Sequence, residues 1–114
     1  VTRANQIWRL PLHADGSVTK ASIFCHLHGG PSGPDGMALD AEGCLLVCHS
    51  GFGTVWRLSP RAEPLARIAS CGGWSTTNLA FRPGTAELFI TDSETGSILH
   101  ANLPAPGLGL HSHA

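Results

Sequence analysis

The feature that most constrains the fold of this chain is an internal repeat with a period in the low forties. Residues 37–39 match residues 79–81 at a separation of 42, and residues 45–47 match residues 88–90 at a separation of 43. The turn residues recur at the same spacing: Ser50 as Ser93, and Gly53 as Gly96. A period of this size without helical periodicity is typical of the blades of a β-propeller.

The repeat also extends backwards, because residues 7–10 match residues 55–58. We therefore expect the chain to open with the outer hairpin of a blade, without the earlier strands of that blade. Alternating apolar residues and turn signals predict about nine short strands, at residues 6–12, 18–24, 37–39, 44–48, 54–58, 64–69, 78–81, 87–91 and 97–103. We predict an all-β partial propeller of about two and a half blades of antiparallel four-stranded sheets. Its parts are an outer hairpin (1–28), a complete blade (33–70), three strands of a last blade (75–104) and a C-terminal tail (105–114), which we expect to be loose.

Charge and composition limit the partners of this domain. The net charge of −1 favours neither nucleic acid nor an anionic membrane as a partner. No apolar run is long enough for a transmembrane helix. Only 13% of the residues are charged, fewer than is usual for a free-standing small domain, so we expect faces normally covered by other protein and self-association through open blade edges.

Asp35 is the strongest functional candidate. It lies between Pro34, whose φ is fixed, and Gly36, which has no side chain, at the start of a short apolar strand. Such a setting holds the carboxylate away from the backbone and lets a ligand approach closely. The alternative is an Asx-type turn that only leads into the strand.

Three further residues are expected on the same rim of the propeller as Asp35. If successive strands run up and down, His49, Asn78 and Asp92 lie at that end of their strands. His49 is a candidate proton relay or substrate ligand, and Asn78 offers an amide donor or an oxygen ligand. For His49 and Asp92 the alternative is a hydrogen-bonded residue of a turn.

The four cysteines, Cys25, Cys44, Cys48 and Cys71, lie among apolar residues. This pattern favours buried thiols in a reducing compartment over a disulfide framework, so we expect a cytoplasmic protein. Two cysteine–histidine groupings, at residues 25–28 and 44–49, leave open a zinc-binding module. Neither has the paired C-x-x-C spacing of a structural zinc site.

Several segments in blade order resemble the C-terminal part of the senescence marker protein, gluconolactonase and luciferin-regenerating-enzyme-like (regucalcin-like) family: residues 33–43 (GPDGMALDAEG), 77–81 (TNLAF) and 89–98 (FITDSETGSI). The resemblance implies a six-bladed propeller with a divalent cation, often calcium, in its central channel. It also implies hydrolysis of lactones or related esters, with Asp35 as metal ligand and base. The family's other metal ligands come from blades that have no counterpart in this sequence.

Three functions therefore stay open at this point. The first is the C-terminal part of a metal-dependent lactonase-type hydrolase, weakly active or inactive alone, acting on a small lactone or sugar-acid substrate. The second is a non-catalytic propeller fragment that binds another protein through open edges. The third is a zinc-binding module.

Overall fold

The computed structural model describes residues 1–113 and confirms the predicted all-β architecture. Its nine strands form three antiparallel sheets. Their bounds are β1 Gln6–Arg9, β2 Ser22–His26, β3 Gly33–Leu39, β4 Leu45–Ser50, β5 Thr54–Leu58, β6 Pro64–Ala69, β7 Thr76–Phe81, β8 Glu87–Asp92 and β9 Ser97–Asn102. Two short 3-10 turns, η1 Thr2–Ala4 and η2 His111–His113, lie near the ends. Within the described part, no helix has the length and apolar character needed to cross a membrane.

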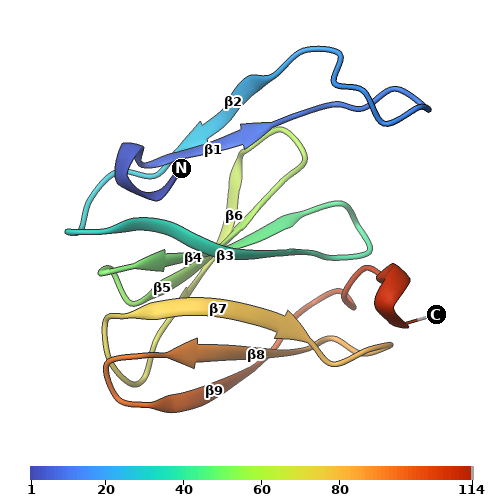
Figure 1. The fold of residues 1–114 in the computed structure, drawn as a ribbon. Helices are drawn as coiled ribbons and strands as arrows, with labels where there is room; N and C mark the ends of the chain where they lie inside the picture. Colours follow the sequence, from blue (N-terminus) through green and yellow to red (C-terminus); the bar gives the residue numbers. More distant parts are fainter. Residues whose placement is uncertain (114) are drawn as a thin grey trace.

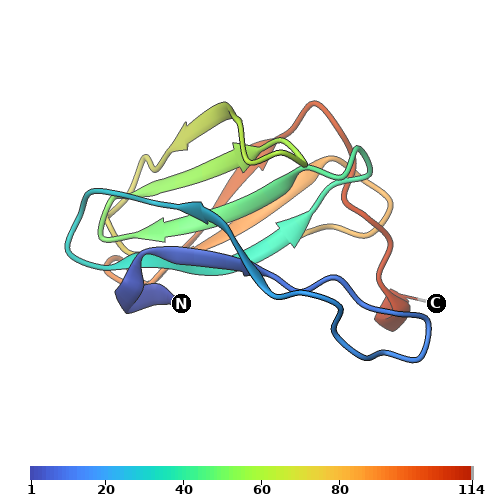
Figure 2. The same cartoon turned by 90° about the horizontal axis from the view of Figure 1, so that it is seen from above.

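The sheets stack as three layers (Figure 1). The hairpin β1-β2 is the first layer, the four-stranded sheet β3-β4-β5-β6 the second, and the three-stranded sheet β7-β8-β9 the third. Strands within each sheet follow the order of the sequence, and the view from above shows the sheets overlapping (Figure 2). This arrangement is that of a partial β-propeller in which β3 and β7 are the innermost strands of their blades.

The apolar core fills the spaces between the layers. One cluster joins the second and third layers: Leu46, Cys48, Val55, Leu79, Leu88 and Ile90. The other joins the first and second layers: Ile7, Leu27, Val47 and Leu58. Because side chains alternate along a strand, β4 sends Leu46 and Cys48 to one neighbouring blade and Val47 to the other.

The largest differences from the predicted strand bounds lie in the first three strands, of which the second begins at Ser22, four residues later than expected. The first strand ends at Arg9, since Pro11 cannot donate to a ladder, and only an isolated bridge joins Leu12 to Val18 beyond it. The third strand begins four residues earlier than expected, at Gly33. Asp35 therefore lies within β3, at a register shift between Pro34 and Met37, and not in a turn before the strand.

Residues 106–108 of the C-terminal tail are fixed by hydrogen bonds to residues beside β3 and β7, so this part of the tail is not the loose segment that was expected. The amide of Ala41 donates to the Pro106 carbonyl (2.8 Å), and the amide of Leu108 donates to the Leu39 carbonyl (2.9 Å). Gly107 lies against the ring of Phe81, where a Cβ atom would clash with the ring. The tail thus ties the end of β3 to the end of β7.

Candidate functional site

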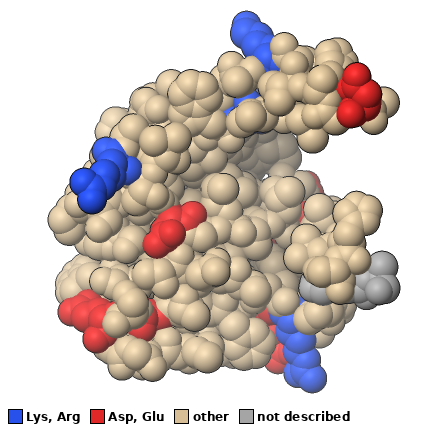
Figure 3. All heavy atoms as spheres, in the orientation of Figure 1, with Lys and Arg blue, Asp and Glu red and all other residues tan. Residues whose placement is uncertain are grey.

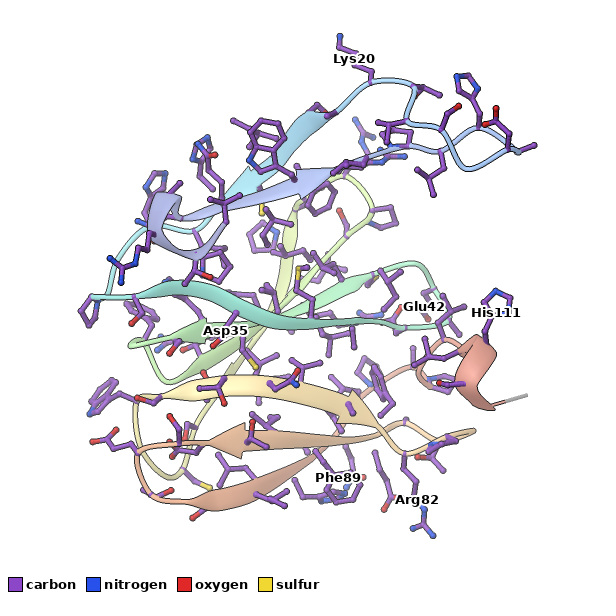
Figure 4. The ribbon with its side chains drawn as sticks, in the orientation of Figure 1. Lys20, Asp35, Glu42, Arg82, Phe89 and His111 are labelled. Carbon is purple, nitrogen blue, oxygen red and sulfur yellow. The ribbon has the colours of Figure 1, made fainter. Side chains whose placement is uncertain are left out.

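Asp35 presents an exposed carboxylate near the start of the innermost strand β3. Figure 4 shows its side chain between β3 and β7, at the end of the blade opposite to Glu42. Among the described residues, the carboxylate has no hydrogen-bond or ion-pair partner, whereas those of Asp40 and Asp92 are fully engaged. Asp35 is therefore free to contact a ligand.

Asn78, on the neighbouring inner strand β7, lies directly beside Gly36, the residue that follows Asp35. A Cβ atom added to Gly36 would clash with Asn78 Oδ1 and would lie 2.6 Å from the Asn78 Cα. Only glycine at position 36 allows the two inner strands to approach this closely. The close approach brings β3, which carries Asp35, next to an amide oxygen on β7.

The oxygen donors of these two residues fit a hard divalent cation. Carboxylate and amide oxygens are ligands that calcium prefers. Asn78 Oδ1 accepts one hydrogen bond from the Leu79 amide (2.9 Å) and keeps a second lone pair. A calcium ion takes roughly six to eight oxygens, so this pair supplies only part of a coordination shell.

A buried thiol, that of Cys48, lies in the interior next to Asp35. Cys48 is fully buried on β4 and faces the third layer. Burial, and secondarily the negative charge of Asp35, raise the pKa of Cys48 to about 12. The thiol is therefore neutral at physiological pH and acts as a small apolar packing residue.

His49 reaches the predicted rim, but its side chain points to the other face of β4. It is fully buried and stacks on Phe52 at 4.9 Å between ring centroids. Trp56 Nε1 donates to His49 Nδ1 (3.1 Å), which leaves Nε2–H to donate to the Gly29 carbonyl (2.9 Å). Burial lowers the pKa of His49, so the ring is neutral and both its nitrogens are occupied.

The Asp92 carboxylate also makes structural hydrogen bonds within the fold. Its carboxylate is buried and accepts hydrogen bonds from the amides of Gly73 and Glu94 and from the Thr95 hydroxyl. Burial alone would raise the pKa of Asp92, but these hydrogen bonds outweigh it and hold the pKa below its ordinary value. The contacts of Asp92, like those of His49, thus agree with the alternative interpretation, a hydrogen-bonded residue of a turn.

His49 and Asp92 occupy equivalent positions of the repeat. They are 43 residues apart, and each fixes the linker that enters its own blade, at Gly29 and at Gly73 respectively. His49 donates to a carbonyl and Asp92 accepts from an amide, so the contact is kept with reversed polarity. The 43-residue spacing was the signal in the sequence that the two residues hold equivalent positions.

Thr76 is a residue that the sequence reasoning missed. It is buried at the start of β7, and its hydroxyl lies 3.1 Å from the Thr54 carbonyl and 3.4 Å from the His49 carbonyl. Thr76 thereby joins the third layer to the second at the rim that carries Asp35 and Asn78.

A second group of metal-ligating side chains lies at the other end of the blade. Asp40, Glu42 and Cys44 place one ligand atom each within 4.8 Å of one another. Arg57 occupies this group, with its guanidinium 2.8 Å from Asp40 and 2.7 Å from Glu42. An arginine guanidinium is always protonated, and the hydrogen bonds with Glu42 and Asp40 raise the pKa of Arg57 further. The group therefore already holds a permanent cation, and we assign it a structural role.

Among the described residues, the two cysteine–histidine groupings at residues 25–28 and 44–49 do not come together to form a zinc site. Cys48 and His49 face opposite sides of β4, and no set of three metal ligands combines the cysteines with the histidines of residues 25–28. All four cysteines are free thiols. Cys44 and Cys48 are buried as expected, whereas Cys71 is exposed.

Because His49 is buried, we expect the free energy of unfolding of the chain to depend on pH. Since its folded-state pKa is lowered, its contribution is complete above the unfolded-state pKa of about 6.5 and is lost as the pH falls below that value. Urea unfolding at about pH 7.5 and about pH 5.5 should show this loss. Its upper limit is about 1.4 kcal/mol for each pH unit by which the pKa of His49 is lower in the folded state than in the unfolded state. His49→Gln, which keeps a donor and an acceptor but does not titrate, should reduce the difference. His13→Gln, at an exposed position, should leave it unchanged, and an equal effect of both variants would contradict the assignment.

Comparison with known proteins assigns this chain to a family. Residues 2–94 match the family described as SMP-30/Gluconolactonase/LRE-like region. The chain is 26% identical over 99 residues to diisopropyl-fluorophosphatase of Loligo vulgaris, covering 85% of this chain and 31% of that protein.

Two solved structures have the same fold. A calcium-binding protein, regucalcin, from Agrobacterium tumefaciens is 27% identical, with a TM-score of 0.77 over 92% of this chain and 41% of that one. A luciferin-regenerating enzyme, 20% identical, has a TM-score of 0.76 over 92% of this chain and 40% of that one. The chain spans less than half the length of each of these relatives. With its matched region reaching from the first hairpin into the last blade, the chain belongs to the SMP-30/gluconolactonase/LRE-like family.

Proposed function

We propose that this chain provides the Asp35-bearing part of a calcium-dependent, gluconolactonase-like hydrolase that opens small lactones or sugar-acid esters. The observation that carries the proposal is the free carboxylate of Asp35 on the inner strand β3, next in sequence to Gly36, which Asn78 of the inner strand β7 approaches closely. Family membership supports the reaction class. The free thiols agree with a cytoplasmic location, which stays a prediction.

Asp35 and Asn78 have distinct roles in this proposal. Both would hold the cation through their side-chain oxygens, and zinc is a less suitable occupant of an all-oxygen set. When bound, a divalent cation polarises the ester carbonyl and lowers the pKa of water. Asp35 orients the attacking water and accepts its proton at a carboxylate oxygen. The Asn78 amide nitrogen donates a hydrogen bond to a substrate oxygen.

The proposal includes a limit on activity. Two oxygen donors are far fewer than a calcium ion takes, and the relatives are more than twice as long as this chain. The isolated chain should therefore bind calcium weakly and hydrolyse lactones little or not at all.

A non-catalytic role in protein interaction is the second candidate. It is favoured by the large apolar side chains exposed on the open layers, which include Trp8 (46% exposed), Met37 (51%) and Ile98 (71%). In this case the open edges would bind another protein, and Asp35 would have no ligand.

Calcium titration separates the two candidates. We expect the chain to bind calcium with a Kd of roughly 10⁻⁴–10⁻³ M, as weak, incomplete sites do. Calorimetry and native mass spectrometry at low ionic strength would measure the binding, and release of acid from a simple aldonolactone would measure hydrolysis. No calcium binding at millimolar concentration would contradict the metal-dependent proposal and favour the interaction role.

A further inference from the structure

The two inner strands carry a bulge at the same position of the repeat. The register of β3 shifts between Pro34 and Met37, and that of β7 shifts between Thr76 and Asn78. At such a bulge an extra residue interrupts the hydrogen-bonded ladder, so the nearby backbone groups need other partners. In β3 the bulge carries Asp35, the candidate metal ligand.

One side chain provides these partners in β7. Thr91, on the neighbouring strand β8, accepts a hydrogen bond from the Asn78 amide (3.1 Å) and donates one to the Asn78 carbonyl (3.3 Å). Its Oγ1 also lies 2.9 Å from the hydroxyl oxygen of Thr77. A hydroxyl has one hydrogen and two lone pairs. With its hydrogen on the carbonyl, its lone pairs accept the Asn78 amide and the Thr77 hydroxyl, so Thr91 uses its whole hydrogen-bonding capacity on the bulge.

The side chain of Asn78 is fixed as well. Its Oδ1 accepts a hydrogen bond from the Leu79 amide (2.9 Å) and lies against Gly36 of β3, where a Cβ atom would clash with it. Asn78 therefore has its backbone held by Thr91 of its own blade and its side chain at the inner strand of the preceding blade.

The preceding blade offers an internal comparison. By the repeat, Gly36 is equivalent to Asn78 at a separation of 42, and Cys48 is equivalent to Thr91 at a separation of 43. Where the inner strand has glycine, and so no side chain to orient, the partner strand has a buried thiol that packs in the apolar core. Where the inner strand has asparagine, the partner strand has an exposed hydroxyl bonded to its backbone. The hydroxyl thus occurs together with the side chain that it can position.

A cation at Asp35 would depend on such an uncharged donor. Figure 3 shows few charged side chains on the face that carries Asp35 in Figure 4. Calcium can complete its shell with amide oxygens as well as carboxylates, so the position of Asn78 Oδ1 bears directly on affinity.

We infer that Thr91 is a positioning residue of the candidate cation site. Its hydroxyl holds the Asn78 backbone in the bulge, and this keeps Asn78 Oδ1 on the side of Gly36, in the strand that carries Asp35. Thr91 acts through Asn78 and is not itself a ligand. The inference rests on the proposed function for the role of Asn78 as an oxygen ligand.

Substitution of Thr91 by valine tests this role, because valine is also β-branched but has no hydroxyl. We expect Thr91→Val to weaken calcium binding about tenfold, the lower end of the effect of removing a group that orients a metal ligand. Thr91→Ser should keep the affinity of the natural chain. NMR titration with calcium at low ionic strength would measure these affinities. In the same samples, the nuclear Overhauser effect between the Asn78 side chain and the α-hydrogens of Gly36 should be present with threonine or serine and lost with valine.

Thr85 provides the matched control. Its hydroxyl donates to the Arg82 carbonyl (3.0 Å) and accepts from the Glu87 amide (3.1 Å), in the turn that joins β7 to β8. Thr85→Val removes the same kind of backbone contact at the other end of the hairpin and should leave calcium affinity unchanged. In an Asn78→Ala background, Thr91→Val should have no further effect on affinity, since Thr91 acts through Asn78.

These measurements keep failure of the inference apart from failure of the proposed function. Equal effects of Thr91→Val and Thr85→Val on calcium affinity, or an unchanged contact between Asn78 and Gly36 in Thr91→Val, would overturn the inference. Weaker binding by Asp35→Asn would still support the proposed function in that case. If the natural chain bound no calcium, the proposed function would fail, and the contact between Asn78 and Gly36 would alone decide whether Thr91 positions Asn78.

Discussion

Replacing Asp35 by asparagine is expected to weaken calcium binding at least about tenfold, or about 1.4 kcal/mol. Asparagine has nearly the same size and keeps one oxygen, but it removes the anionic ligand on which a hard cation depends. The exposed carboxylate of Asp35 has no hydrogen-bond partner among the described residues, so the substitution should leave the fold unchanged. Calorimetric titration of both proteins at low ionic strength would measure the difference.

A matched variant separates ligation from general electrostatics. Glu63→Gln removes one negative charge at an exposed position in the turn between β5 and β6, where Glu63 forms an ion pair only with the exposed Arg61, at 3.8 Å. Calcium affinity in this variant should stay close to that of the natural chain, because exposed charges at a distance are screened. Equal weakening by the two substitutions, or none by Asp35→Asn, would leave Asp35 as a residue of the strand bulge without a metal role.

The fold was predictable because the sequence repeats itself. Matching segments at separations of 42 and 43 gave the number of strands per blade and their order, and the match of residues 7–10 to residues 55–58 gave the half-blade at the start. Periodicity alone did not locate the ends of the strands. Asp35 was expected in a turn, but the bulge between Pro34 and Met37 lets β3 continue through it.

The candidate site was only partly predictable, for a reason of geometry. The up-and-down course of the strands placed His49 and Asp92 on the correct rim, but it did not say which face each side chain occupies. Neighbouring residues of a strand point to opposite faces, so Cys48 lies toward Asp35 while His49 lies toward Gly29. Comparing His49 with its repeat equivalent Asp92 would have shown that the two residues hold one position of the blade, but not that they fix the linkers.

The tail and the buried ion pairs were hidden for a different reason, since both depend on long-range contacts. Residues 105–108 have little strand character, and they are fixed by hydrogen bonds to Leu39, Ala41 and Thr85. Arg57 follows the alternation of β5 to a buried position, where only the turn at Asp40 and Glu42 satisfies its charge. Local pattern carries no information about such partners.

Arg57→Met is expected to cost about 3–5 kcal/mol of unfolding free energy. The Arg57 side chain is 9% exposed and Asp40 is 1% exposed, so the substitution leaves a carboxylate buried without its cation. Asp40 also accepts the amides of Glu42 and Cys44, and its backbone bridges to Gly107 of the tail. Without Arg57, the carboxylates of Asp40 and Glu42 repel each other at this turn. This repulsion should loosen the tail together with the end of β3.

Urea unfolding, followed by far-ultraviolet circular dichroism, would measure this loss. Arg61→Met is the matched control, because Arg61 is 87% exposed and its ion pair with Glu63 is weak, so a change within about 0.5 kcal/mol is expected. The double variant Arg57→Met with Asp40→Asn should recover part of the stability, since no uncompensated charge stays buried. If Arg57→Met were as mild as Arg61→Met, the ion pair would contribute little and the tail would be held by its backbone hydrogen bonds alone. If the double variant recovered nothing, the loss would come from the packing of the Arg57 stem and not from the charge left on Asp40.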